Sequence, residues 1–315
     1  MSDLPPPRLQ LFKPPFFSTG DDCFGPMHVK VGHRSEKRWG LIFKCMTTRA
    51  VHLDILRSMD SDAFLMAFRR FASLRGKPYE LISDQGSNFR GAKTELHEAL
   101  ASMEPDLAAQ LARHKVRFVF NVPHAPHFGG VWEREIKSVK YGLRVALGDQ
   151  TVKEPVLRTI LAEVAVILNS KPLAYVSSDV RDVDPVTPNI LLIGRHDASL
   201  PQVVYPADEL LSRRRWHHSQ VLADHFLVHF VKYYLPDMQL RTKWQKERQN
   251  LKMNDVVMIV DPQLLRAQWP VGRVTKTYPG TDGCVRTATV SVKDKEYTRP
   301  ITRLIPLPEC ADDDN

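Results

Sequence analysis

Leu81-Ile82-Ser83-Asp84-Gln85-Gly86-Ser87-Asn88-Phe89 is a short apolar run that ends in an acidic residue and a turn. The run has the composition of a buried strand, and Gly86–Asn88 has the composition of a tight turn. We therefore predict a strand that carries Asp84 at its carboxyl end. An aspartate at the end of a strand is common, so the fold has to be inferred from the elements on either side.

Three segments upstream have the composition of strands, and the segments downstream change to helical spacing. Short polar turns between the upstream segments suggest an antiparallel meander. The predicted elements are strands at 27–31, 39–45, 50–56, 80–83 and 116–121, and helices at 63–74, 91–113, 130–147 and 154–169. Three antiparallel strands followed by helix, strand, helix and strand is the order of an α/β ribonuclease-H-like fold with a mixed five-stranded sheet. An open sheet of this kind places ligands near the carboxyl ends of its strands.

Composition divides the chain of 315 residues into five parts. A proline-rich segment precedes the α/β core, and helical spacing follows it over 209–248. Beyond 251, short strands interrupted by Gly and Pro predict a small SH3-like all-β barrel. The predicted parts are an extended lead-in at 1–19, the core at 20–197, a linker and helical segment at 198–250, the barrel at 251–307 and an acidic tail at 308–315.

The chain is basic, with 44 Lys and Arg residues against 36 Asp and Glu, a net charge of +8 and a pI near 9.3. An excess of this size favours polyanionic partners, nucleic acid before anionic membrane, although a soluble protein can also be this basic without such a partner. No apolar run approaches the roughly 18 residues that span a bilayer, and the N-terminus has no signal-peptide pattern. We therefore expect an intracellular protein with no membrane partner.

The four cysteines lack the paired spacing of a disulfide framework or a zinc site, which fits a reducing compartment. Cys23 has no histidine placed to activate it, so we interpret it as a packed side chain and not as a nucleophile.

Glu133 stands near the start of a predicted helix, directly after the turn Phe128-Gly129-Gly130. Lys137, Lys140 and Arg144 follow it on that helix, and at 3.6 residues per turn all three fall within roughly 40° of Glu133. The helix therefore offers a carboxylate followed by a basic stripe, which a DNA backbone near bound metal ions requires. A solvated face with Glu-to-Lys pairing, at about 0.3 kcal/mol, explains the helix in isolation better. The glycine turn and the acidic partner at Asp84 favour the functional interpretation.

A third acidic residue comes from Thr19-Gly20-Asp21-Asp22-Cys23. Asp21 and Asp22 compete for this position, because strand alternation lets only one of them point into a site. Three carboxylates without nearby cysteine pairs suit hard cations such as Mg²⁺ or Mn²⁺. Two such ions about 4 Å apart can activate a nucleophile and stabilise a leaving oxygen in phosphodiester chemistry.

Two further groups of residues are candidates for contacts with nucleic acid. Asn88 either positions a phosphate or braces the turn after Asp84, and bracing is the more common role of such a residue. In the predicted barrel, basic residues that include Arg273 and Arg299 outnumber the acids. Alternation would put several of them on one exposed face, as DNA-binding barrels require, although a merely soluble barrel also fits.

Taken together, these motifs resemble the integrase of Pao/BEL-type long-terminal-repeat retrotransposons, which is related to retroviral integrases. The resemblance covers about residues 18 to 307. The stretches that carry it are Thr19–Pro26, Thr47–Leu53, Ser83–Phe89, Ala125–Arg134, Leu168–Leu173, Leu191–Gly194, Gly272–Val274 and Thr298–Pro300. The chain departs from the family pattern at Asp21, where an apolar residue is usual, and at Cys23, where an aromatic residue is usual.

The resemblance implies that Asp22, Asp84 and Glu133 are the metal-binding acidic triad and hold two Mg²⁺ or Mn²⁺ ions. It implies a polynucleotidyl transferase that trims the 3′ end of element DNA and joins it to target DNA. The implied partner is double-stranded DNA, and the implied state is a homo-oligomer that is nuclear when it acts on chromosomal DNA. Because the chain starts just before the core, we expect full integration to need the zinc-binding domain that the family carries upstream.

Two other interpretations remain open from the sequence. One is a catalytically silent DNA-binding protein derived from a retrotransposon. The other is a related nuclease of the same fold that cleaves an RNA–DNA hybrid, although the Gly129-Gly130 to Glu133 motif and the basic barrel favour integrase.

Overall fold

The computed structural model describes residues 13–84, 105–110, 112, 115–121, 132–148, 150–176, 184–195, 215–233, 250–261, 269–293 and 295–308. The chain separates into two compact units. The first consists of Met1–Ala165 and Tyr205–Ala223, and the second consists of Val166–Val204 and Asp224–Asn315. Among the described residues, no helix is both long enough and apolar enough to cross a membrane.

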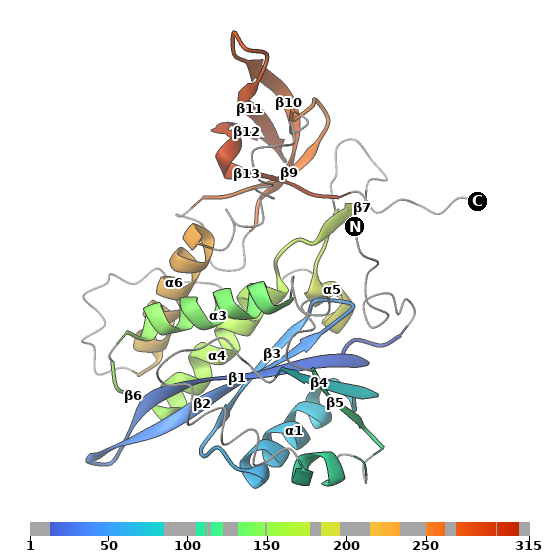
Figure 1. Cartoon of the computed structure of the whole chain (residues 1–315). Coiled ribbons are helices and arrows are strands. Elements are labelled where there is room, and N and C mark those ends of the chain that lie inside the picture. The colour runs from blue at the N-terminus through green and yellow to red at the C-terminus, as the bar shows by residue number, and fades with distance from the viewer. Residues whose placement is uncertain are drawn as a thin grey trace. The chain divides into compact units, whose positions relative to one another are not determined.

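The first unit contains a mixed sheet whose main strands lie in the order β3-β2-β1-β4-β5. Strands β1, β2 and β3 form an antiparallel meander, and β4 and β5 run parallel to β1 (Figure 1). A short sixth strand, β6, pairs with the far end of β1. The strands are β1 (Ser18–Val31), β2 (Arg34–Cys45), β3 (Val51–Leu56), β4 (Glu80–Asp84), β5 (Arg117–Asn121) and β6 (Val152–Lys153). This mixed sheet with its helices fits the predicted ribonuclease-H-like fold.

Helices lie on both faces of this sheet, with α1 on one face and α3 and α4 on the other (Figure 1). Helix α1 covers its face through phenylalanines, and the Phe71 ring stacks on Phe43 of β2 at a centroid distance of 4.2 Å. Asp60 caps α1 by accepting a hydrogen bond from the Ala63 N–H. The helices of the first unit are α1 (Ser61–Arg75) and α3 (Trp132–Leu147), and α4 (Glu154–Asn169) and α6 (Arg215–Tyr233) begin in the first unit and end in residues assigned to the second.

Strand β1 is longer than the sequence predicts, because it starts at Ser18 and not at Met27. A register shift between Phe24 and Met27 interrupts its alternation, so the sequence pattern shows only the second half as a strand. Most of the predicted helix at 91–113 lies outside the described residues. Within that range, residues 105–110 and 112 are described, and they are helical. Helix α6 lies within the stretch that the sequence predicts as helical, and the predicted domain boundaries stay predictions.

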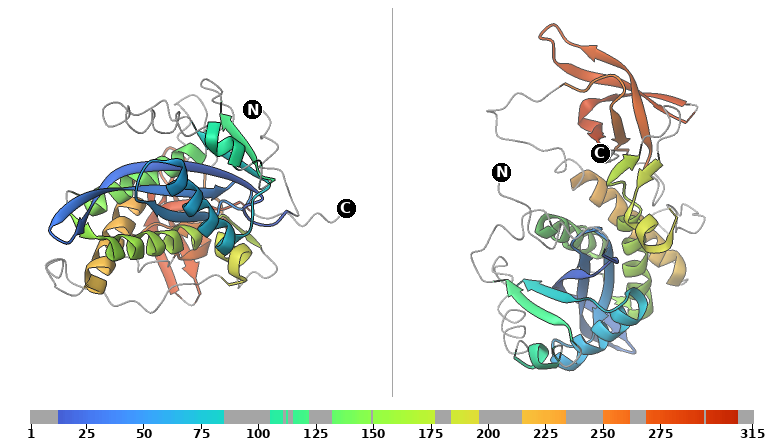
Figure 2. Two further views of the ribbon diagram at one scale, coloured as in Figure 1. Left: turned by 90° about the horizontal axis from the view of Figure 1, so that it is seen from below. Right: turned by 90° about the vertical axis from the view of Figure 1, so that its right-hand side faces the viewer.

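The second unit contains a five-stranded antiparallel sheet in the order β12-β11-β10-β9-β13 (Figure 2). Its hydrophobic core consists of buried side chains from adjacent strands, among them Val257, Val274 and Val290. These strands are β9 (Val256–Ile259), β10 (Val271–Pro279), β11 (Val285–Val292), β12 (Lys295–Pro300) and β13 (Leu304–Pro306). The sheet is compatible with the predicted small barrel.

The second unit also contains a two-stranded sheet and a short helix that the sequence does not predict. These elements are β7 (Ala174–Val176), β8 (Asp184–Val186) and α5 (Pro188–Ile193). Thr187 caps α5 by accepting a hydrogen bond from the Ile190 N–H, and Gly194 ends the helix with a φ of 71°. Elements of this length have no clear periodicity, so composition alone did not reveal them.

Candidate active site

Asp22 and Asp84 occupy neighbouring positions on two parallel strands. The register of β1 and β4 pairs Gly20 with Ile82 and Asp21 with Ser83. The next residues along the two strands are Asp22 and Asp84. Two of the three predicted acidic residues therefore directly follow the last pair of the ladder, at its carboxyl end.

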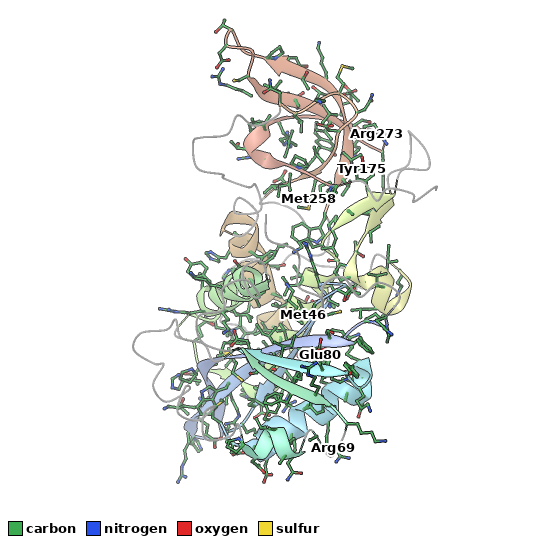
Figure 3. All side chains as sticks on the ribbon, turned by 45° about the vertical axis from the view of Figure 1, so that its right-hand side comes forward. Met46, Arg69, Glu80, Tyr175, Met258 and Arg273 are labelled. Carbon is green, nitrogen blue, oxygen red and sulfur yellow. The ribbon has the colours of Figure 1, made fainter. Side chains whose placement is uncertain are left out.

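Side-chain contacts at both ends of the ladder fix this register. Ser18 donates a hydrogen bond from Oγ to Oε1 of Glu80 at 2.6 Å, at the start of β4 (Glu80 is labelled in Figure 3). At the other end, Ser83 donates a hydrogen bond to Oδ2 of Asp21 at 3.3 Å. A slip by one residue would break both contacts, so the relative position of Asp22 and Asp84 is determined by the packed part of the sheet.

The structure separates Asp21 from Asp22 by face. Asp21 pairs in register with Phe43, whose ring contacts α1, and its side chain is buried at 1% exposure. Asp22 pairs with Ile42 and belongs to the opposite face, where α3 lies. Its side chain is 19% exposed. Of the two competing aspartates, Asp22 is the one on the face of α3.

Lys140 of α3 forms an ion pair with Asp22. Its Nζ lies 2.5 Å from Oδ2 of Asp22, and the Lys140 side chain is 11% exposed. A half-buried carboxylate that holds a cation has the donor chemistry that a divalent metal ion needs. The contact also joins α3 to β1 and so places the basic stripe of α3 next to the strand that carries Asp22.

Glu133 is the second residue of α3. Helical geometry places it on the same side of the helix as Lys140 and about 10 Å away along the axis. The side chains of Asp84 and Glu133 lie outside the described part of the chain. Among the side chains that are described, no three His, Cys, Asp or Glu residues are grouped to hold a metal ion.

Two further basic residues of α3 face solvent. Lys137 and Arg144 are exposed, whereas Val139 and Leu143 on another side of the helix are buried. This distribution agrees with the predicted amphipathic helix, in which the apolar side packs and the cations stay accessible.

Cys23 of β1 is a free and buried thiol. Burial raises the pKa of the Cys23 thiol well above its usual range, and the nearby Asp21 and Asp22 carboxylates raise it further. A thiol in this environment stays protonated and is a poor nucleophile or metal ligand.

Two of the residues of the C-terminal sheet that are predicted to contact nucleic acid also have contacts within the second unit. Arg273 and Arg299 are half-buried and already engaged within the unit (Arg273 is labelled in Figure 3). Arg273 donates to the Asn254 carbonyl at 3.1 Å, and Arg299 lies 3.7 Å from Asp261. The exposed cations of this sheet are Lys276, Arg286, Lys293 and Lys295. Asn88 lies outside the described residues.

Sequence reasoning missed one charged network in the first unit. Glu154, the first residue of α4, accepts from Arg38 of β2 at 3.0 Å and from Arg158 at 3.0 Å, and it lies 3.3 Å from Arg57. Burial opposes the ionisation of Glu154, but the hydrogen bonds from Arg158 and Arg38 outweigh it and lower the pKa of the carboxyl group. Of these contacts, only the ion pair between Glu154 and Arg158 could have been inferred from the sequence, because the two residues are four positions apart on a helix.

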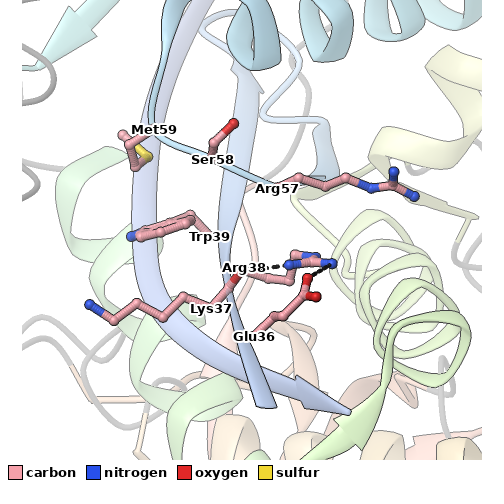
Figure 4. A pocket seen from close by; sticks show the side chains of 7 residues that line it. All are labelled: Glu36, Lys37, Arg38, Trp39, Arg57, Ser58 and Met59. Carbon is pink, nitrogen blue, oxygen red and sulfur yellow. Dashed lines mark hydrogen bonds and ion pairs between the residues drawn. The ribbon is translucent and has the colours of Figure 1, made fainter. Parts of the chain in front are cut away.

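A pocket of about 470 Å³ lies where β3 ends and leaves the edge of β2 open (Figure 4). Its lining residues are Glu36, Lys37, Arg38, Trp39, Arg57, Ser58 and Met59.

Comparisons with known proteins give a match to one family model and matches to solved structures, among them two integrase structures. Residues 214–307 match a family of unknown function (DUF5641). None of the curated proteins matches the sequence. A simian T-cell lymphotropic virus intasome in complex with PP2A regulatory subunit B56 gamma is 14% identical, with 93% of this chain and 79% of that chain covered and a TM-score of 0.33.

The HTLV-2 integrase catalytic core domain in complex with magnesium, in a trimeric form, is 19% identical. The match covers 51% of this chain and 89% of that chain, with a TM-score of 0.33. Both neighbours are retroviral integrase structures, but TM-scores this low support no conclusion. The fold and the candidate site rest on the strand register and side-chain contacts given above.

Proposed function

We propose that this chain contains the catalytic core of an integrase of a Pao/BEL-type retrotransposon. Its reactions would be metal-dependent 3′-end processing and strand transfer of element DNA into target DNA. The observation that supports the proposal is the parallel ladder of β1 and β4, whose last pair, Asp21 with Ser83, directly precedes Asp22 and Asp84, together with the contact between Lys140 of α3 and Asp22. Neighbouring acids at the carboxyl ends of parallel strands, with a basic helix next to them, fit phosphodiester chemistry.

The residues that would hold two Mg²⁺ or Mn²⁺ ions are Asp22, Asp84 and Glu133. When bound, two such ions lower the pKa of the attacking hydroxyl or water and stabilise the charge on the leaving oxygen. Asp22 supplies an accessible carboxylate that already holds a cation, and Cys23 stays protonated, so oxygen ligands dominate here.

The basic side chains of α3 would hold the DNA backbone near the acidic residues. Lys137 and Arg144 are exposed on that helix, and Lys140 lies against Asp22. Their charge would orient the phosphodiester for in-line attack, which is mainly a positioning effect. DNA affinity would fall as salt rises, because each phosphate contact releases counterions.

Double-stranded DNA would be the partner in both reactions, as element ends and as target. We further propose that the active form is a homo-oligomer, that it acts in the nucleus, and that the sheet of the second unit is an SH3-like barrel that adds DNA contacts through its exposed lysines.

The test is a joining assay on branched DNA, in which the reversal of strand transfer releases a rejoined strand, with Mg²⁺ or Mn²⁺ present. We expect joined product from the wild type and none from Asp22→Asn or Asp84→Asn. Asp21→Asn is the matched control, because Asn keeps the acceptor for Ser83 on the other face of the sheet. Asp21→Asn should therefore retain activity.

Three outcomes would reject the proposal. Metal-dependent cleavage of an RNA–DNA hybrid without joining would identify a nuclease of the same fold. Salt-sensitive DNA binding without any metal-dependent reaction would identify a silent binding protein. Loss of joining in Asp21→Asn together with full activity in Asp22→Asn would show that the active site lies on the face of the sheet that carries Asp21.

A further inference from the structure

The far end of the β1–β2 hairpin carries basic side chains on one face. His28 pairs in register with Lys37, and Lys30 pairs with Ser35 of β2 and with Lys153 of β6. Register partners on adjacent strands point to the same face of a sheet. The side chains of Lys30, Lys37 and Lys153 are all exposed. These three residues, on three neighbouring strands, form what we call the lysine face.

The lysine face is the part of the α1 side of the sheet that α1 does not cover. Lys37 shares its face with Phe43 by alternation, and Phe43 packs on α1. The hairpin extends beyond the start of α1 (Figure 1). On the opposite face Val29 and Val152 are buried, and Arg38 is held by Glu154 of α4. The opposite face is therefore packed at Val29, Val152 and Arg38, whereas the three lysine side chains are exposed.

These lysines oppose the stability of the fold. Lys30 and Lys153 are direct register partners, and like charges in that position are destabilising. The single acid of the hairpin strands beyond the bulge, Glu36, lies on the other face and pairs with Arg38. Among the described residues, neither Lys30 nor Lys153 forms an ion pair. Ion pairing within the described residues therefore does not account for the charges of Lys30 and Lys153, whereas a polyanionic partner does.

The side chains around the lysine face favour a nucleic acid over an anionic membrane. A membrane-binding surface inserts apolar side chains between lipids. The large apolar residue exposed on this hairpin is Val31, at 41%, and alternation puts it on the opposite face. Trp39 borders the lysine face and is only half-buried, so it offers an aromatic edge and little surface to insert.

The pocket beside β2 continues the lysine face toward β3. Lys37, Trp39 and Met59 lie on one side of the strand, and Glu36, Arg38 and Arg57 lie on the other (Figure 4). Lys37 can contact a phosphate group through its ammonium group, and the neighbouring Trp39 ring can contact a base.

We propose that the lysine face binds the backbone of a segment of duplex DNA other than the one at Asp22. Lys30 lies eight positions beyond Asp22 on the same strand, which corresponds to about 25 Å, and on the opposite face of the sheet. One straight duplex at the Asp22 edge does not reach it. The inference concerns binding only, so it does not depend on the proposed chemistry.

The test measures DNA affinity of the full chain against salt concentration, in EDTA, on a blunt duplex of scrambled sequence. The variant is Lys30→Gln/Lys153→Gln, and the matched control is Lys77→Gln/Lys115→Gln, which removes the same charge from exposed sites elsewhere in the unit. Loss of two phosphate contacts should reduce the slope of log affinity against log salt by about 1.8 and weaken binding at least about tenfold near 0.1 M salt. The control should keep the wild-type slope.

Equal slopes for the variant and the control would overturn the proposal. So would a variant that keeps its DNA affinity but no longer binds vesicles of phosphatidylserine and phosphatidylcholine, which would identify a membrane surface. A thermal unfolding midpoint of the variant at or above that of the wild type would show that the loss is not due to misfolding, because the substitution relieves a like-charge pair. The joining assay fails or succeeds independently of this measurement.

Discussion

The ammonium group of Lys140 lies 2.5 Å from Oδ2 of Asp22, although the two residues are 118 positions apart in the sequence. This ion pair connects the helix that carries Glu133 with the strand that carries Asp22. It has two effects, since it ties α3 to the sheet and keeps a positive charge next to a candidate metal ligand.

Replacement of Lys140 by Gln should destabilise the first unit by about 1–2 kcal/mol, because it leaves the half-buried Asp22 carboxylate without its charged donor. Urea unfolding measures this change. Lys137→Gln is the control, because Lys137 is exposed on the same helix and its loss should change the free energy of unfolding by less than about 0.5 kcal/mol. Equal effects of the two substitutions would show that the ion pair adds nothing to stability.

Glu154→Gln should destabilise the protein at neutral pH by about 2 kcal/mol, because Arg38 is buried at 5% exposure and would keep only Glu36 as a charged partner. The folded-state pKa of Glu154 is lowered, so its ionised form contributes stability above its unfolded pKa and loses that contribution as pH falls through the folded pKa. The difference between wild type and variant should therefore shrink below about pH 4. Chemical unfolding at several pH values measures it, and a difference that is independent of pH would contradict the expectation.

His52 should make the protein less stable in mild acid. Its pKa is lowered to about 4, first by burial and then by the positive charge of Arg75. Because the folded state favours the neutral ring, stability is complete above about pH 6.5 and falls as pH drops toward 4, by at most about 3 kcal/mol. A His52→Gln variant should lose this dependence while the wild type keeps it. Unfolding curves of both proteins at pH 7 and at pH 4.5 measure this difference, and an equal loss of stability in the two proteins would contradict the expectation.

Gly40→Ala should destabilise the sheet near the candidate site, because a Cβ at this position would lie 2.0 Å from the Phe24 ring. Overpacking of this kind costs about 1–3 kcal/mol. The double variant Gly40→Ala/Phe24→Leu should recover part of that loss, since a smaller side chain then faces the new methyl group. Additive losses in thermal unfolding would mean that the ring moves aside freely.

Much of the fold follows from the sequence because the relevant patterns are local. Alternation locates β2 and β3, and helical spacing locates α1, predicted at 63–74 and observed over Ser61–Arg75. The length of β1 does not follow, because a register shift after Phe24 breaks the alternation that marks a strand.

The candidate site was predictable as a set of acids but not as a geometry. Nothing local distinguishes Asp21 from Asp22, and only the pairing with Phe43 and Ile42 assigns each to a face. In the same way, the alternation in the second unit does not reveal that Arg273 donates a hydrogen bond to the Asn254 carbonyl. Contacts between residues distant in sequence decide such cases.

Because the ladder between β1 and β4 is short, the candidate site depends on the number of residues along each strand as much as on the side chains. Asp22 and Asp84 both directly follow the last pair of the ladder, because each lies three residues beyond a pair that packing holds in place, Thr19 with Leu81. A deletion of one residue within either strand would turn its acid toward the opposite face, even though every carboxylate were retained. Many side chains along these strands can therefore be substituted without moving the acids to the other face, whereas the number of residues between the packed pair and each acid has to stay the same.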